Sequence, residues 1–157
     1  MTVVPWGDLY DQAFPSVYRA LVAATGDRER ALDGLHDAFE EGLRHPPAQG
    51  SNLAGWLYRV ALRKTRRGLF RARRTSAPLH GMGSADDTAQ LLDRLEVGRL
   101  LAILTERQRA IVVAHYYLGL THDEIAQALG IRRGTVSATV SQSLARVRVG
   151  GDVHVRP

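Results

Sequence analysis

The residues whose chemistry is easiest to interpret form a run of positive charge near the middle of the chain. Residues 59–74 contain eight basic side chains and no acidic one: Arg59, Arg63, Lys64, Arg66, Arg67, Arg71, Arg73 and Arg74. A solvated helix face usually mixes both signs, because like charges on one helix repel each other. This run therefore favours contact with a polyanion through its phosphates. Trp56, Tyr58 and Phe70 could also stack on unpaired bases, although Trp56 lies on an apolar stripe that favours the core.

A second signal for nucleic-acid binding lies in the last quarter of the chain. Thr121 starts a capping box for a short helix, and Gly130 stands where the end of that helix needs a left-handed residue. Ala126 supplies the small residue where two helices touch, and Val136 supplies an apolar anchor early in the next helix. These features in this order indicate a helix-turn-helix, whose second helix enters the major groove of DNA. An ordinary helical hairpin is the alternative.

The second helix of this motif offers a short set of side chains for reading base pairs. Arginine can bind guanine and glutamine can bind adenine through paired hydrogen bonds. The candidates for base contact are Arg132, Arg133, Thr135, Ser137, Ser141 and Gln142. Residues 137–143 carry no charge, so we expect few phosphate contacts and a shallow salt dependence for this part of the chain.

Acidic side chains collect on one amphipathic helix in the first third of the chain. Residues 27–44 carry Asp27, Glu29, Asp33, Asp37, Glu40 and Glu41 on the face opposite their apolar side chains, which include Leu43. A solvated surface is one interpretation, and a docking face for a basic protein partner is the other.

Composition and motifs argue against an enzyme. The chain has 157 residues, a formal charge of +5 and a pI near 10.2, which favours a polyanionic partner. It has no cysteine, so disulfides and thiolate metal sites are excluded. The six histidines show no metal-ligand spacing, although His115 and His122 could lie near one another. No phosphate-binding glycine loop or nucleophile elbow is present, so we expect no metal, no cofactor and no catalysis.

The hydrophobic pattern predicts helices only. We expect them over residues 5–24, 27–44, from Asn52 into the basic run, over 88–103, over 105–117, and in the helix-turn-helix, which Gly150 and Gly151 should end. Asp27 and Asn52 are expected to cap the helices that they begin, Thr105 starts a second capping box, and Tyr10 is a candidate for the buried side of the first helix. Residues 45–51 read as a loop, 75–87 as a flexible linker and 152–157 as a tail. No signal peptide or membrane-spanning run is visible, so we expect a cytoplasmic protein that does not insert into the membrane.

The chain resembles the bacterial RNA polymerase sigma factors of the extracytoplasmic-function (ECF) type. The resemblance rests on Leu-Thr-Glu-Arg-Gln-Arg at 104–109, Thr-His-Asp-Glu-Ile-Ala at 121–126 and Gly-Ile-Arg-Arg-Gly-Thr-Val at 130–136. Residues 31–39 resemble the family's polymerase-docking helix, and residues 56–61 resemble the start of its promoter-melting helix. The resemblance implies an all-α fold of two small domains. Residues 1–74 would form a three-helix domain like sigma region 2, 75–87 the linker, 88–150 a four-helix domain like sigma region 4, and 151–157 the tail.

The resemblance also implies partners and binding residues. Core RNA polymerase would bind through the clamp helices of its largest subunit and the flap of its second subunit. The polymerase contacts would be Asp33, Leu35, His36, Asp37, Phe39 and Glu40. The melted proximal promoter element would contact Trp56, Arg59, Arg63, Lys64, Arg66 and Arg67, and the upstream element would meet the helix-turn-helix as duplex. An anti-sigma factor is a further expected partner.

Two other functions stay open at this stage. One is a stand-alone transcriptional regulator that uses the same helix-turn-helix without polymerase. The other is a sigma-like protein that acts mainly through an anti-sigma partner.

Overall fold

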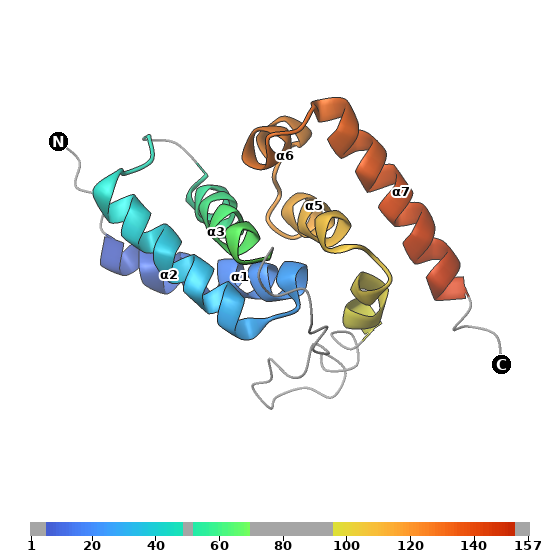
Figure 1. Ribbon diagram of the computed structural model, residues 1–157, viewed down its shortest axis with the longest axis horizontal. Coiled ribbons are helices and arrows are strands. Elements are labelled where there is room, and N and C mark those ends of the chain that lie inside the picture. Colours follow the sequence, from blue (N-terminus) through green and yellow to red (C-terminus); the bar gives the residue numbers. More distant parts are fainter. Residues whose placement is uncertain (1–5, 49–51, 70–95, 153–157) are drawn as a thin grey trace.

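The structure is a computed structural model that describes residues 6–48, 52–69 and 96–152, and within these ranges every regular element is a helix (Figure 1). The elements are α1 (Trp6–Thr25), α2 (Arg28–Arg44), α3 (Leu53–Leu69), a helical segment over 96–102, α5 (Glu106–Tyr116), α6 (His122–Leu129) and α7 (Arg133–Asp152). The prediction of an all-helical fold is confirmed. None of the described helices is both long and apolar enough to cross a membrane.

Helices α1, α2 and α3 pack around one apolar centre in which Val17, Leu21, Leu35 and Leu57 are completely buried. The backbones of α2 and α3 approach closely at Gly34. An ideal Cβ at this position would lie 2.7 Å from Thr65 Cγ2 and 3.0 Å from the carbonyl oxygen of Ala61. Gly34 therefore allows a contact that any larger residue would force apart.

Helices α5, α6 and α7 form a second group. The turn between α6 and α7 depends on Gly130, whose φ of 65° lies in the left-handed region that the sequence predicts. Val136 at the start of α7 is completely buried, as are Ile111 of α5 and, to within 1%, Ile125 of α6. These residues fix the two helices of the helix-turn-helix against α5.

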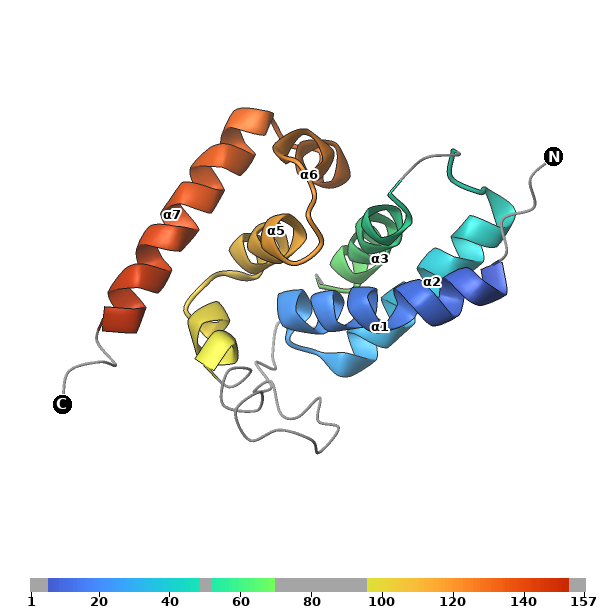
Figure 2. The ribbon, with the colours of Figure 1, turned by 180° about the vertical axis from the view of Figure 1, so that it is seen from behind.

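The two groups of helices share a single hydrophobic core, because α5 lies between α7 and the first three helices (Figures 1 and 2). The Tyr58 hydroxyl of α3 donates a hydrogen bond of 2.8 Å to the Ala110 carbonyl of α5. Arg109 Nε donates to the Ala24 carbonyl at the end of α1 over 3.2 Å. A salt bridge of 3.1 Å joins Arg30 of α2 to Glu106 of α5. The described halves of the chain are thus held in direct contact.

The residues that cap the helix N-termini are those that the sequence predicts. Thr105 and Thr121 each form a complete capping box, with Gln108 and Glu124 respectively. Asp27 accepts from the backbone N–H of Arg30, and Asn52 accepts from that of Gly55 over 3.0 Å. Each of these caps follows from residues three positions apart, which is why sequence alone locates them.

Two expectations need correction, and two others lie outside the described ranges. Helix α7 runs through Gly150 and Gly151 to Asp152, because Gly150 packs directly on the side chain of Ile103 and the helix continues past that contact. Leu43, expected on the buried side of α2, is 63% exposed. The expected linker over 75–87 and the tail beyond residue 152 lie outside the described residues.

Replacing Gly34 by alanine is expected to lower the free energy of unfolding by about 1–3 kcal/mol, because the new methyl group overpacks the α2–α3 contact. Urea denaturation measures the change. Gly7→Ala is the matched control, since nothing lies within 4 Å of a Cβ placed there. Equal stability of the two variants would contradict the close approach of α2 and α3.

Candidate nucleic-acid interfaces

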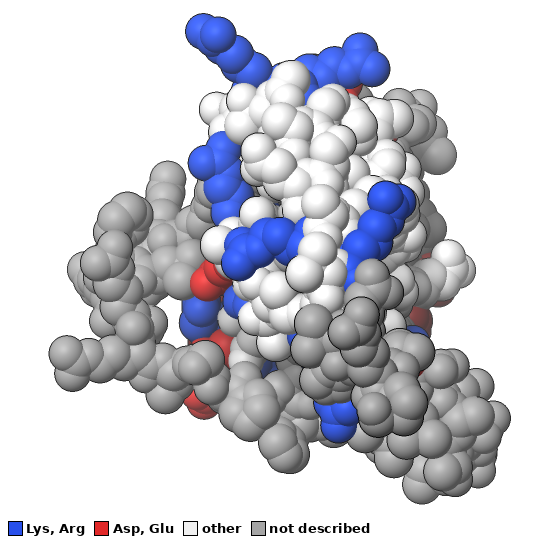
Figure 3. Space-filling model, turned by 90° about the vertical axis from the view of Figure 1, so that its right-hand side faces the viewer, with Lys and Arg blue, Asp and Glu red and all other residues white. Residues whose placement is uncertain are grey.

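The start of α7 presents most of the predicted base-reading residues to solvent. Arg132, Arg133, Thr135, Ser141 and Gln142 are exposed, whereas Ser137 is half-buried. Viewed from the side on which α7 lies in Figure 1, Lys and Arg side chains stand around a broad uncharged area (Figure 3). The outer face of α7 is therefore open and largely uncharged, as the sequence predicts.

Two of these residues are engaged by the first turn of α6. Arg133 Nε lies 3.6 Å from Asp123 Oδ1 in an exposed salt bridge. A hydrogen bond of 2.9 Å joins His122 Nδ1 to Ser137 Oγ. The side chains of Arg132, Thr135, Ser141 and Gln142 have no such recorded bond to α6 within the described part of the chain.

The two histidines that the sequence placed near one another are in contact. The rings of His115 and His122 have centroids 4.8 Å apart, and His115 Nδ1 hydrogen-bonds with the Leu120 carbonyl over 2.9 Å. The described residues hold no group of three or more His, Cys, Asp or Glu side chains that could bind a metal ion. The pair therefore acts through packing and hydrogen bonding in this structure.

The basic face of α3 lies away from the acidic side chains. Arg63 and Lys64 are exposed, and no ion pair joins Arg59, Arg63 or Lys64 to an acid within the described ranges. Desolvation lowers the pKa of Arg59, and the charge of Arg63 lowers it further. The Nε atom of Arg59 is buried without a hydrogen-bond partner among the described atoms. An anion next to Arg59 and Arg63 would offset the repulsion between their two charges. The side chains of Arg66, Arg67 and the later basic residues lie outside the described set.

The aromatic residues of α3 serve the core. Trp56 is half-buried and packs against the shared core, which matches the alternative raised for it. Tyr58 is 1% exposed, and its hydroxyl is bonded to Ala110. In this conformation Tyr58 therefore cannot stack on a base, and the stacking expectation for it is wrong. The hydrogen bond of Tyr58 to Ala110, 52 positions away, could not be predicted from the residues near Tyr58 in the sequence. Phe70 lies outside the described residues.

The residues of α2 expected to bind polymerase divide into two sets. Asp33, His36, Asp37 and Glu40 are exposed on its outer face. Leu35 is completely buried and Phe39 is 8% exposed. Leu35 therefore supports this face from within the core and cannot contact a partner in this conformation, because its position on the helix points at α1 and α3.

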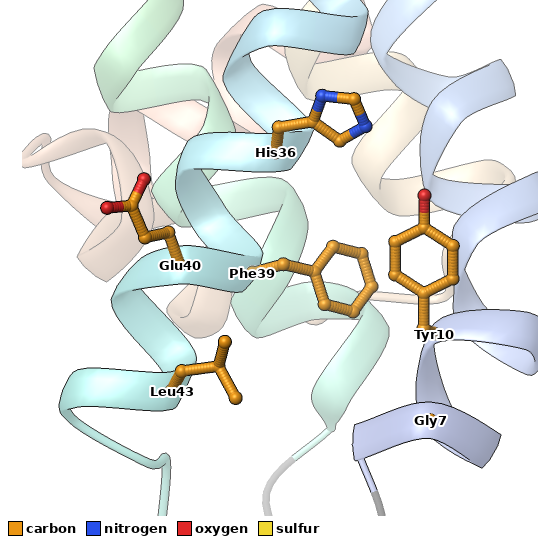
Figure 4. Close-up of a pocket in the computed structure, with 6 residues that line it drawn as sticks. All are labelled: Gly7, Tyr10, His36, Phe39, Glu40 and Leu43. Carbon is orange, nitrogen blue, oxygen red and sulfur yellow. The ribbon is translucent and has the colours of Figure 1, made fainter.

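A shallow groove of about 480 Å³ lies between α1 and α2, next to the acidic face. Tyr10 and Phe39 form its floor with ring centroids 4.7 Å apart, and Leu43 and His36 lie on either side of Phe39 (Figure 4). Sequence reasoning missed the groove, since it assigned Tyr10 and Leu43 to the buried side of their helices. Their positions near the helix ends, where the core stops, are the only sequence feature that separates them from the core residues.

Comparison with known proteins agrees with this geometry. Residues 94–147 match the model of the family described as sigma-70, region 4. The chain is 30% identical over 151 residues to the ECF RNA polymerase sigma factor SigM of Mycobacterium tuberculosis, covering 90% of this chain and 77% of SigM. It is 28% identical over 155 residues to SigL of the same species, covering 90% of this chain and 85% of SigL.

Solved structures share the fold. The sigma factor RpoE of Bartonella quintana, in complex with the anti-sigma factor NepR, superposes with a TM-score of 0.71 at 18% identity, covering 93% of this chain and 96% of that one. CnrH, in complex with the cytosolic domain of CnrY, superposes with a TM-score of 0.67 at 21% identity, covering 94% and 88% of the two chains. Together with the relatives, these likenesses establish that the chain belongs to the ECF RNA polymerase sigma factors.

Replacing Tyr58 by phenylalanine is expected to cost about 1 kcal/mol of unfolding free energy at neutral pH, because it removes a buried hydrogen bond between α3 and α5. Burial raises the pKa of Tyr58 above its ordinary value. Above pH about 10 the unfolded tyrosine loses its proton while the folded one keeps it, so wild-type stability falls as pH rises. The variant should lack this component of the decline.

The measurement is urea denaturation at pH 7 and at several values between 9 and 11. Tyr117→Phe provides the control, because Tyr117 is 51% exposed and should behave as wild type at every pH. An alkaline slope that is the same in wild type and Tyr58→Phe would argue against a buried hydroxyl at this position.

Proposed function

We propose that this sigma factor uses three separate surfaces to direct core RNA polymerase to promoters. Helix α2 and its groove bind polymerase, α3 holds the melted proximal promoter element, and the helix-turn-helix of α6 and α7 reads the upstream element as duplex. Residues 1–74 and 88–150 would act as the two domains, joined by residues 75–87.

The exposed cations of α3 are the observation that carries this proposal. Arg63 and Lys64 are exposed and Arg59 is partly desolvated beside Arg63, without an acidic partner among the described residues. Phosphate groups would bind such a cluster favourably, because they supply the negative charge that the cluster lacks. A separated DNA strand follows a groove or ridge of such charge without needing the geometry of duplex DNA.

The helix-turn-helix supports binding of duplex DNA. The exposed N-terminal end of α7 carries Arg132, Arg133 and Thr135, and the backbone N–H groups of this end favour a phosphate. Gln142 and Ser141 follow on the exposed side, within reach of base edges if the helix enters the major groove. The buried Val136 holds this end against α6, which fixes the direction in which the side chains project.

The outer face of α2 supports binding of polymerase. Asp33, Asp37 and Glu40 give it negative charge, and the groove beside it offers Leu43 and the ring of Phe39 as an apolar contact. Buried apolar contacts with a charged rim are typical of specific protein interfaces. The clamp helices of the largest subunit are the proposed occupant of this face, and the flap of the second subunit is proposed to meet the C-terminal helices.

The test is promoter-directed transcription with purified core polymerase, read by co-elution with core and by fluorescence of a base analogue in the melted region. Arg63→Glu with Lys64→Glu should leave core binding intact and reduce promoter opening by roughly tenfold or more, because both phosphate contacts become repulsive. Asp33→Lys with Asp37→Lys should weaken core binding by roughly tenfold, because the charge of the docking face is reversed.

Matched controls use exposed charges on α1. Arg19→Glu should leave opening unchanged, and Asp11→Lys should leave core binding unchanged. The proposal is wrong if the wild-type chain neither binds core polymerase nor opens a promoter. A high-affinity footprint on duplex DNA without polymerase would instead favour the stand-alone regulator.

We also propose an anti-sigma factor as a partner, supported by the likeness to a sigma factor solved with NepR. The exposed Leu43 gives such a partner an apolar contact at the face that polymerase would use. The native protein is expected to co-purify with the inhibitor, which core polymerase displaces. Leu43→Asp should weaken both interactions, whereas Gln12→Asp, which adds the same charge at an exposed position of α1, should not. Recovery of the native protein only as a free chain would count against this partner.

A further inference from the structure

The first residue of α6 makes a side-chain contact with the helix that is proposed to read DNA. His122 Nδ1 and Ser137 Oγ are 2.9 Å apart, and both residues are half-buried at the junction of the two helices. The bond spans 15 residues and crosses the turn that contains Gly130. It is a direct polar link between the side chains of α6 and the recognition helix.

The His122 ring is itself held in place. It lies against the ring of His115, with centroids 4.8 Å apart. His115 is fixed in turn by the carbonyl of Leu120 and by the edge of the Tyr116 ring, whose centroid lies 4.8 Å away. Ser137 is therefore connected, through the rings of His122 and His115, to the backbone of Leu120 between α5 and α6.

Ser137 differs in this respect from the other uncharged candidates for base contact. A serine hydroxyl can donate one proton and accept hydrogen bonds, and here it is bonded to Nδ1 of the His122 ring, whose tautomer determines which of the two groups donates. Ser141, one turn later, is exposed, and no bond of its hydroxyl is recorded among the described atoms. Ser137 is half-buried at the junction with α6, so turning its side chain toward a base would break the bond to His122, whereas the exposed Ser141 has no such cost.

We propose that His122 is a positioning residue for promoter recognition, and that Ser137 is its anchor on α7 and not a base reader. The pair fixes the angle and rotation of α7 relative to α6. Arg132, Arg133, Thr135, Ser141 and Gln142 then remain as the side chains that meet the bases. This inference rests on the proposed function, in which α7 reads the upstream element.

The charge of α7 makes such positioning important. Residues 137–143 are uncharged, so the helix has few phosphate contacts that could guide it into the groove. Apolar packing of Val136 and Val140 holds the helix against its neighbours without strong directional preference. A hydrogen bond has a defined geometry and supplies the preference that packing lacks.

The test is equilibrium binding of full-length protein with core polymerase to a promoter and to every single-base variant of its upstream element. His122→Phe keeps the ring against His115 and removes the bond, and Ser137→Ala removes its other end. Each is expected to weaken promoter binding about 3- to 10-fold with the same base preferences as wild type. The double variant should be no weaker than either single one.

Two further variants sharpen the result. His122→Asn places an amide on the atom equivalent to Cγ, where it can replace Nδ1, and should restore most of the affinity. Ser141→Ala is the matched control and should alter the preference at one base pair. The inference is overturned if Ser137→Ala changes the preference at a single base pair, or if the losses from His122→Phe and Ser137→Ala add.

A measurement without DNA separates this inference from the proposed function. The ¹⁵N chemical shift of His122 Nδ1 in the full chain should change in Ser137→Ala and stay unchanged in Ser141→Ala. If that shift behaves as expected while wild type shows no promoter preference with polymerase, the proposed function fails and the His122–Ser137 bond stands. An unchanged shift in Ser137→Ala overturns the inference whatever the DNA result.

Discussion

The contact between α5 and the first helices is the constraint on which the rest of the structure depends. Helix α5 is short, and it must cover both the apolar side of α7 and the ends of α1 and α3. The carbonyls of Ala24, at the end of α1, and of Leu104, just before α5, lie where a helix supplies no backbone donor, so they need another donor. Arg109 satisfies Ala24 and Leu104, and Tyr58 bonds to Ala110. Polar side chains thus complete an interface whose area is mainly apolar.

This arrangement decides where the charges can lie. The inner faces of α2 and α3 pack against each other and against α5. Their exposed cations and anions are therefore confined to the outer faces. Asp33 and Asp37 project from α2, while Arg63 and Lys64 project from α3. The two helices touch through Gly34 and Ala61. The rotation of each helix about its own axis therefore determines that the acids of α2 and the cations of α3 lie on separate surfaces.

The sequence predicted the features that depend on neighbours within one helical turn. The caps at Asp27, Asn52, Thr105 and Thr121 and the left-handed Gly130 all follow from local hydrogen bonding, and the apolar periodicity located the helices. The sequence did not predict features that depend on distant partners. The burial of Tyr58, the exposure of Leu43 and the continuation of α7 past its glycines each require knowing which element lies opposite. In the candidate sites, residue type predicted which charged side chains are exposed, whereas the bond between Ser137 and His122 could not be predicted from spacing alone.

The uncharged stretch of the recognition helix, residues 137–143, affects how the proposed surfaces would work together. Because residues 137–143 of α7 carry no cation, duplex binding by this part of the helix alone gains little from phosphate contacts. Two weak DNA contacts that are joined by one chain or one partner bind with higher overall affinity. Binding at the first contact raises the effective concentration of the second contact near the DNA. Polymerase bound at α2 would hold both DNA-contacting surfaces near one promoter and supply that gain. A stand-alone regulator with the same helix would have only the weak contact. The low charge of α7 therefore favours a protein that recognises promoters as part of the polymerase over one that binds DNA independently.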